Sequence, residues 1–103
     1  MYVVYITTST RREAQQIGKA LVSERLAACV NIIDKMHSIY WWEDQIQEDD
    51  ETVLIAKTSK EKMERLTDRV KELHSYSCPC IIALPIQTGN QDYLNWILKE
   101  TSR

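Results

Sequence analysis

Four short apolar runs limit the folds that are open to this chain. They are Tyr2–Ile6, Ala27–Ile33, Val53–Ala56 and Ile81–Leu84. β-Branched residues are frequent in them, which is typical of strands. Because successive residues of a strand point to opposite faces, runs that are apolar at nearly every position predict a sheet with both faces at least partly covered.

Segments in which apolar residues recur at helical spacing lie between these runs. Thr10-x-x-Glu13 and Thr58-x-x-Glu61 each have the spacing of a capping box, in which two side chains satisfy backbone amides at a helix start. We expect a helix from Thr10 to about Glu24 and a second one after Thr58. Asn90 is expected to cap a last helix. Its predicted inner face consists of Tyr93, Leu94, Ile97 and Leu98.

A long hairpin is predicted in the middle of the chain. The second run is interrupted by the polar segment 34–36 and resumes at Ser38–Trp42, which predicts a bulged strand. Glu43 and Asp44 would form the turn, and the return strand would run from Ile46 to Ala56.

The resulting order, β-α-β-β-α-β with a C-terminal helix, predicts an α+β protein with a ferredoxin-like fold in a single domain, residues 1–103. Its antiparallel sheet would carry two helices on one face. The last helix and a second subunit would cover the other face. Tyr40, Trp41 and Trp42 lie beyond the reach of so small a core, so we expect them at a subunit interface. A local core or a ligand-stacking surface is the alternative.

Composition excludes several classes of protein. Of 103 residues, 13 are Lys or Arg and 15 are Asp or Glu, without a basic stripe, which argues against nucleic acid as a partner. No apolar run approaches the ~18 residues of a membrane span, and the N-terminus does not resemble a signal peptide. Three cysteines, an odd number, are expected to be reduced, which favours the cytoplasm.

The segment LHSYSCPC, residues 73–80, is the most chemically suggestive part of the chain. Cys78 and Cys80 are two residues apart, so both thiols of an extended segment could meet one soft ion such as Cu(I), with His74 as a third ligand. Packing of two small apolar side chains at a strand entrance is the alternative. His74 could equally stabilise the end of the preceding helix. Cys29, inside an apolar run, is expected to be an inert core thiol, and His37 a solvent-side or interface residue.

A second candidate site combines residues of the hairpin with Tyr76, which follows the second helix. An inward ammonium on Lys57 would need a carboxylate in a salt bridge or a ligand anion. The acidic run 48–51 could attract cations or simply form a solvated bend. The predicted cleft set is Tyr40, Trp42, Glu48, Lys57 and Tyr76.

Five strings in order resemble the CutA divalent-cation tolerance family: ERLAACVNI (24–32), SIYWWEDQIQEDDE (38–51), KT (57–58), LHSYSCP (73–79) and IIALPIQTGNQDYLNWI (81–97). The resemblance implies a tight homotrimer similar to the nitrogen-regulatory PII proteins, with a histidine at position 74 lining an intersubunit cleft. It also implies a role in tolerance of copper and other divalent metals, with no catalytic activity and no obligatory cofactor. Membrane insertion is not expected.

The chain departs from that family pattern in the same segment. Where the family has His-Pro-Tyr-Glu-x-Pro-Glu, residues 74–80 place Ser77 and Cys80 at the two acidic positions. A cysteine implicated in copper binding in some bacterial members corresponds to Ile6, which cannot bind a metal ion. We therefore expect weak metal binding through His74, Cys78 and Cys80. A signalling or scaffold trimer that binds a small ligand or a protein in its clefts is the alternative.

Overall fold

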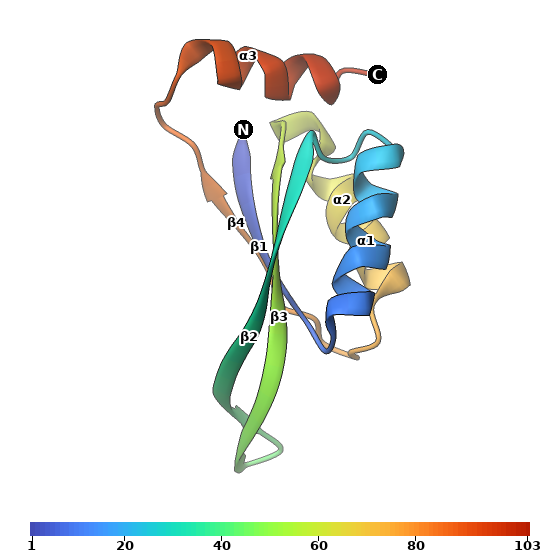
Figure 1. Cartoon of the computed structure of the whole chain (residues 1–103), viewed down its shortest axis with the longest axis vertical. Coiled ribbons are helices and arrows are strands. Elements are labelled where there is room, and N and C mark those ends of the chain that lie inside the picture. The colour runs from blue at the N-terminus through green and yellow to red at the C-terminus, as the bar shows by residue number, and fades with distance from the viewer.

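The computed structural model describes all 103 residues, and its elements follow the predicted order (Figure 1). The strands are β1 (Tyr2–Thr8), β2 (Cys29–Trp42), β3 (Gln45–Thr58) and β4 (Ile81–Pro85). The α-helices are α1 (Arg11–Ser23), α2 (Met63–Leu73) and α3 (Gln91–Glu100), and one turn of 3-10 helix, η1 (Lys60–Lys62), precedes α2. None of the helices combines the length and apolar character that a membrane crossing requires.

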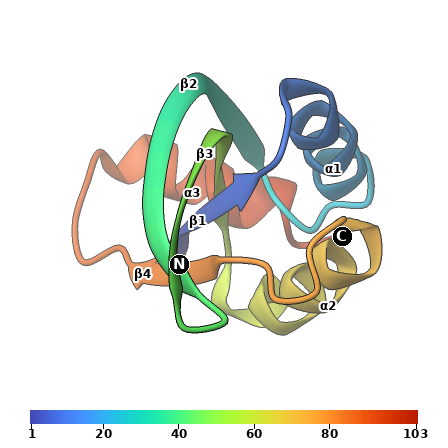
Figure 2. The same cartoon turned by 90° about the horizontal axis from the view of Figure 1, so that it is seen from below.

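The four strands form one antiparallel sheet in the order β2-β3-β1-β4, which is the ferredoxin-like arrangement. Helices α1 and α2 lie next to each other on one face, as Figure 2 shows from below. Helix α3 crosses the end of the sheet near the N-terminus (Figure 1). We call the face opposite α1 and α2 the outer face.

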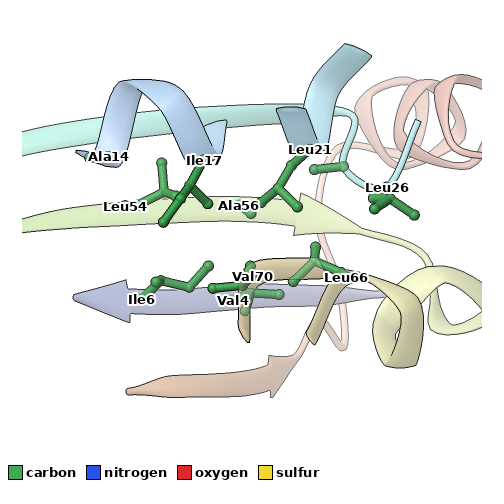
Figure 3. Close-up of a cluster of buried hydrophobic side chains, with 11 residues drawn as sticks. Val4, Ile6, Ala14, Ile17, Leu21, Leu26, Leu54, Ala56, Leu66 and Val70 are labelled. Carbon is green, nitrogen blue, oxygen red and sulfur yellow. The ribbon is translucent and has the colours of Figure 1, made fainter. Parts of the chain in front are cut away.

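The main core lies between the sheet and the two helices (Figure 3). Alternate residues of the two central strands point toward the helices, because side chains of a strand alternate between faces. Burying each large aliphatic side chain contributes about 1.5–3 kcal/mol. The side chains that meet there include Val4 and Ile6 of β1, Leu54 and Ala56 of β3, Ile17 and Leu21 of α1, and Leu66 and Val70 of α2.

The predicted bulge in β2 is confirmed by the strand register. Ile33 pairs with Val53, whereas the next paired residue, Met36, is opposite Glu51. Strand β2 therefore contains one residue more than β3 over this interval. Lys35 adopts a left-handed backbone with φ of 62°, which accommodates the extra residue.

Asp34 connects the bulge to the helical side of the molecule. Its carboxylate accepts a hydrogen bond from the Thr52 hydroxyl at 2.8 Å and forms an ion pair with Arg11 at 2.9 Å. These hydrogen bonds from Arg11 and Thr52 hold the pKa of Asp34 below its usual value. The bulge is thus tied both to β3 and to the first turn of α1.

The hairpin of β2 and β3 extends well beyond the core (Figure 1), and the molecule measures 44 × 25 × 22 Å. Glu43 and Asp44 have φ of 51° and 62°, which is a two-residue turn matching the right-handed twist of the strands. Ile39, Trp41 and Ile46 near the tip are 66%, 71% and 62% exposed. No part of the same chain covers these apolar side chains.

The start of α1 differs in one detail from the predicted capping box. The Thr10 hydroxyl accepts a hydrogen bond from the Glu13 amide at 3.1 Å, as expected. The Glu13 carboxylate does not return to Thr10. It accepts from the Ser9 amide at 3.0 Å and from the Ser75 amide at 2.9 Å. Glu13 therefore connects the start of α1 to the segment that follows α2.

The second predicted capping box was wrong. Thr58 is the last residue of β3, and its buried hydroxyl donates to the Leu26 carbonyl at 2.6 Å instead of capping a helix. Ser59 occupies the cap position of η1 without a side-chain hydrogen bond. A buried carbonyl that lacks a backbone partner competes successfully for such a hydroxyl.

The predicted cap of α3 is confirmed, whereas its inner face was only half right. Asn90 accepts a hydrogen bond from the Asp92 amide at 3.1 Å. Leu94 and Ile97 are buried against Ala28, with Met1 and Ile86 alongside. Tyr93 and Leu98 remain 41% and 46% exposed, because α3 contacts only the end of the sheet and not its whole outer face.

Substitution of Glu13 tests the connection that its carboxylate makes between the start of α1 and the segment that follows α2. Burial alone would raise the pKa of Glu13, but hydrogen bonds from Ser75 and Ser9 lower it overall. Because the pKa of Glu13 is lower in the folded state than its unfolded value of 4.5, the ionised carboxylate stabilises the fold above pH 4.5. This contribution is lost as the pH falls through the pKa of the folded state.

We expect Glu13→Gln to lower the free energy of unfolding by about 1–2 kcal/mol at pH 7, because the charge-assisted hydrogen bonds from Ser9 and Ser75 are weakened. The difference from wild type should shrink between about pH 5 and pH 3. Urea denaturation at several pH values measures both quantities, and a pH-independent difference would contradict this role of the carboxylate.

Candidate functional site

A cavity of about 590 Å³ lies on the outer face between the β2–β3 hairpin and the segment that joins α2 to β4. Five of the predicted site residues line it together. They are Tyr40 and Trp42 of the hairpin, and Tyr76, Cys78 and Cys80 of the connecting segment. Two separate predictions, an aromatic cleft and a thiol pair, therefore converge on one cavity.

The hairpin wall consists mainly of alternate residues of β2, with Ile39 between them. Ser38, Tyr40 and Trp42 share one face of the strand because side chains alternate. The Tyr40 hydroxyl donates to the Asp49 carboxylate on β3. That hydrogen bond raises the pKa of Tyr40, so its phenol stays protonated. Tyr40 and Trp42 are 39% and 45% exposed and thus present open ring surface.

Tyr76 forms the opposite wall. Its hydroxyl donates to the Glu51 carboxylate at 2.8 Å, which joins the connecting segment to β3. Burial raises the pKa of Tyr76 strongly, and the hydrogen bond to Glu51 adds to the increase. Glu51 also lines the cavity and is the only charged side chain that does so.

His74, predicted as a metal ligand, is only 9% exposed and uses both ring nitrogens within the chain. Its Nε2 donates to the Thr7 carbonyl at 2.7 Å, and its Nδ1 accepts from the Tyr76 amide at 3.1 Å. The two rings also lie 4.7 Å apart between centroids. His74 therefore holds Tyr76 in place, and binding of a metal ion by this imidazole would require one of these hydrogen bonds to break.

The two thiols at the cavity differ in their surroundings. Cys78 is exposed, whereas Cys80 is partly buried next to the start of β4. Burial raises the pKa of the Cys80 thiol, despite an opposing hydrogen bond with Thr7. Cys80 is therefore a thiol at neutral pH, and a soft metal ion would have to displace its proton. No three His, Cys, Asp or Glu side chains gather around one point.

Within the chain, two members of the predicted cleft lie away from this cavity. Lys57 is at the far end of β3, where its ammonium donates to the Asn31 side chain at 2.6 Å. The expected salt bridge to a carboxylate is not formed. Glu48 accepts instead from His37 on the opposite face of the hairpin, at 2.8 Å.

The other histidine and the third cysteine have distinct environments. The exposed His37 ring bonds to Glu48 and, at 3.2 Å, to Asp50, and these carboxylates raise its pKa. Cys29 was expected in the core, which was wrong. It points to the outer face, partly exposed, with its sulfur 3.4 Å from the Tyr93 hydroxyl.

Glu51 is a site residue that the sequence analysis did not single out. Its run, residues 48–51, was treated as one acidic patch, yet alternate members serve different faces: Glu48 and Asp50 bond to His37, while Asp49 and Glu51 bond to tyrosines. The signal that could have separated them is the strict alternation of side chains along a strand.

Comparison with known proteins identifies the family. Residues 2–100 match the family described as CutA1 divalent ion tolerance protein. The divalent-cation tolerance protein CutA of Thermus thermophilus is 48% identical over 99 residues, which is 96% of each chain. A solved structure of the protein from that organism covers 97% of both chains with a TM-score of 0.95. This chain therefore belongs to the CutA1 divalent ion tolerance family.

Other relatives have names that refer to different compartments. A solved structure from Archaeoglobus fulgidus, described as a periplasmic divalent cation tolerance protein CutA, is 42% identical, covers 97% of both chains and has a TM-score of 0.94. A rice relative named as chloroplastic is 43% identical over 96% of this chain and 56% of its own length. None of the family names describes an enzyme.

Replacement of His74 tests its role in holding Tyr76. We expect His74→Ala to lower the free energy of unfolding by about 2–3 kcal/mol, because the Thr7 carbonyl and the Tyr76 amide lose their partners. His37→Ala is the matched control and should change stability little, since that ring is exposed. Equal effects of the two substitutions in guanidinium denaturation would contradict a structural role for His74.

Proposed function

We propose that this protein acts without catalysis, as a homotrimer that binds copper or another divalent cation weakly and thereby contributes to cation tolerance. Membership of the family supports the tolerance role. The observation that carries metal binding is the placement of two thiols, Cys78 and Cys80, on the same cavity. Thiolates favour soft ions, and Cu(I) accepts as few as two of them. We place this role in the cytoplasm, where thiols stay reduced.

Trimer formation is supported by the apolar surface that the chain leaves uncovered. The hairpin tip exposes Trp41, and the outer face exposes Ile82 and Leu84 of the edge strand β4 at 52% and 56%. An edge strand beside an exposed apolar face is suited to pairing with another copy. Tyr40, Trp41 and Trp42 are the residues we expect at the interface.

A second candidate function is a PII-like signalling or scaffold trimer that binds a small molecule in its clefts. The cavity favours this alternative, because its volume of about 590 Å³ lies within the range of small-molecule sites. Tyr40, Trp42 and Tyr76 provide the aromatic walls. Glu48 and Lys57, which lie away from the cavity, would join such a cleft only if a neighbouring subunit supplied them.

Copper titration under reducing conditions tests the thiol site. We expect the double substitution Cys78→Ser/Cys80→Ser to weaken Cu(I) binding at least about tenfold, because two thiolates are replaced by poor ligands for a soft ion. Cys29→Ser, which changes a thiol outside the cavity, is the control and should leave the affinity unchanged. Equal affinity of wild type and double variant would remove the thiol site and leave the scaffold alternative.

Analytical ultracentrifugation tests the assembly. Wild type is expected to sediment with three times the 12.1 kDa mass of the chain. Trp41→Ser should weaken association at least about tenfold, since buried tryptophans contribute strongly to interfaces. Val22→Ser, on the helical side of the molecule, should have no such effect. A wild type that stays monomeric at micromolar concentration would be incompatible with the proposed trimer.

A further inference from the structure

We propose that His37, Glu48 and Asp50 form a proton-dependent clamp across the β2–β3 hairpin. The clamp holds the apolar tip of the hairpin in position when the imidazole is charged and releases it when the imidazole is neutral. Assembly of the trimer thereby depends on pH near neutrality. This second step rests on the proposed function, in which the hairpin tip forms the subunit interface, whereas the clamp itself does not.

The three clamp residues lie on one face of the hairpin. His37 is directly opposite Asp50 in the strand register, and Glu48 lies two residues nearer the turn on the same strand as Asp50. The imidazole Nδ1 is 3.2 Å from the Asp50 carboxylate, and Nε2 is 2.8 Å from the Glu48 carboxylate. Tyr40 and Trp42, which line the cavity, point to the other face. The clamp is therefore complete within one chain and separate from the cavity.

The geometry of the clamp suits the charged imidazole and not the neutral one. A neutral imidazole has one N–H and one lone pair, so only the imidazolium can donate to two carboxylates at once. Loss of the proton leaves a lone pair against a carboxylate oxygen and two negative charges without a positive one. Hydrogen bonds to Glu48 and Asp50 raise the pKa of His37. The clamp is consequently complete below the unfolded value of 6.5 and is lost as the pH rises through the pKa of the folded state.

No other charged group competes for this imidazole within the chain. His37 is the only residue of segment 36–51 whose side chain ordinarily titrates near neutral pH. Asp49 and Glu51 accept hydrogen bonds from tyrosines on the other face. Near the bulge, Asp34 is paired with the first turn of α1, and Lys35 lies beside it. No hydrogen bond or ion pair joins the His37 ring to α1 or α2.

The hairpin depends on such cross-strand pairs because little else supports it. Strand β1 pairs with β3 only from Thr52 onward, so segment 36–51 is a ribbon of two strands beyond the sheet. Two-stranded ribbons are marginally stable in water, and cross-strand side-chain pairs contribute to their stability. The clamp lies between the bulge, where the ladder is interrupted, and the exposed apolar tip with Ile39, Trp41 and Ile46. Its protonation state therefore affects how firmly the tip is held.

The clamp and the proposed trimer are mutually consistent. The expected interface residues Tyr40, Trp41 and Trp42 continue the strand that carries His37. A neighbouring subunit packed on the tip would exclude water near the clamp, and ion pairs strengthen where water is excluded. Proton binding and assembly are then coupled, and each favours the other.

Amide hydrogen exchange of the full-length protein, followed by mass spectrometry at pH 6 and pH 9, tests the clamp. Wild type and His37→Gln are compared at each pH, so that the pH dependence of the intrinsic exchange rate cancels. We expect amides of segment 38–47 to be about threefold more protected in wild type than in His37→Gln at pH 6, and equally protected at pH 9. Amides of β1 and α1 should not differ between the two proteins.

Further variants separate the charge of the imidazole from its shape. His37→Lys carries a charge at both pH values and should keep the hairpin protected at pH 9. The double substitution Glu48→Gln/Asp50→Asn should abolish the difference between the two pH values, because the imidazole then has no carboxylate to pair with. Glu61→Gln on η1 removes a carboxylate outside the hairpin and should behave as wild type.

Subunit exchange between isotopically labelled and unlabelled protein, followed by native mass spectrometry, tests the step to assembly. From pH 6 to pH 9, we expect the exchange rate of wild type to rise about threefold more than that of His37→Lys.

Equal protection of wild type and His37→Gln at pH 6 would overturn the clamp, and so would a difference of the same size at both pH values. Protection as expected, together with subunit exchange that changes equally in wild type and His37→Lys, would overturn the link to assembly. A monomeric wild type would refute the proposed trimer and with it that link, while the protection of the hairpin would still decide the clamp.

Discussion

The packing of two helices against a single face of the sheet is the constraint on which the rest of this molecule depends. Val4 and Ile6 from one strand, and Leu54 and Ala56 from the next, meet α1 and α2 in one continuous core. A chain of 103 residues has no further helix to cover the opposite face, because α3 is engaged at the end of the sheet. Every candidate functional surface therefore lies where that core leaves the sheet open.

The connecting segment after α2 is held in shape by hydrogen bonds and not by packing against the hydrophobic core. Glu13 holds the Ser75 amide from the start of α1, and His74 joins the Thr7 carbonyl to the Tyr76 amide. The segment is thus fixed from two directions before it reaches its cysteines. His74 resembles a metal ligand in the sequence, but in the structure its hydrogen bonds hold Tyr76 in position.

Sequence patterns predicted the order and the type of every main element, because strand-like runs and helical spacing are local properties. The bulge was also predictable, since a polar interruption at residues 34–36 separates two parts of one strand. The second capping box failed for a reason that no local pattern reveals: the Thr58 hydroxyl is claimed by the Leu26 carbonyl from another part of the chain.

The candidate site was predicted only in part, because local sequence patterns do not reveal which distant residues meet. Aromatic residues and thiols were recognised by type, yet their union in one cavity depends on which face of the hairpin each residue occupies. Lys57 and Glu48 shared a strand with Glu51 and were separated from it only by register and distance. Cys29 belongs to an apolar run but faces the outer side, because the run has two faces and only one of them meets the core.

The extra residue in β2 has a consequence for how this surface is encoded. Before the bulge Ile33 lies on the outer face, and after it Ser38, Tyr40 and Trp42 do. The extra residue lets an odd-numbered residue before the bulge and even-numbered residues after it share one side of the sheet. If side chains alternated regularly through residues 34–36, Ile39 and Trp41 would lie on the outer face in place of Ser38, Tyr40 and Trp42. Deletion of one residue there would remove the bulge and leave the same side chains on the cavity wall, so that wall depends on the register with β3 and tolerates loss of the extra residue.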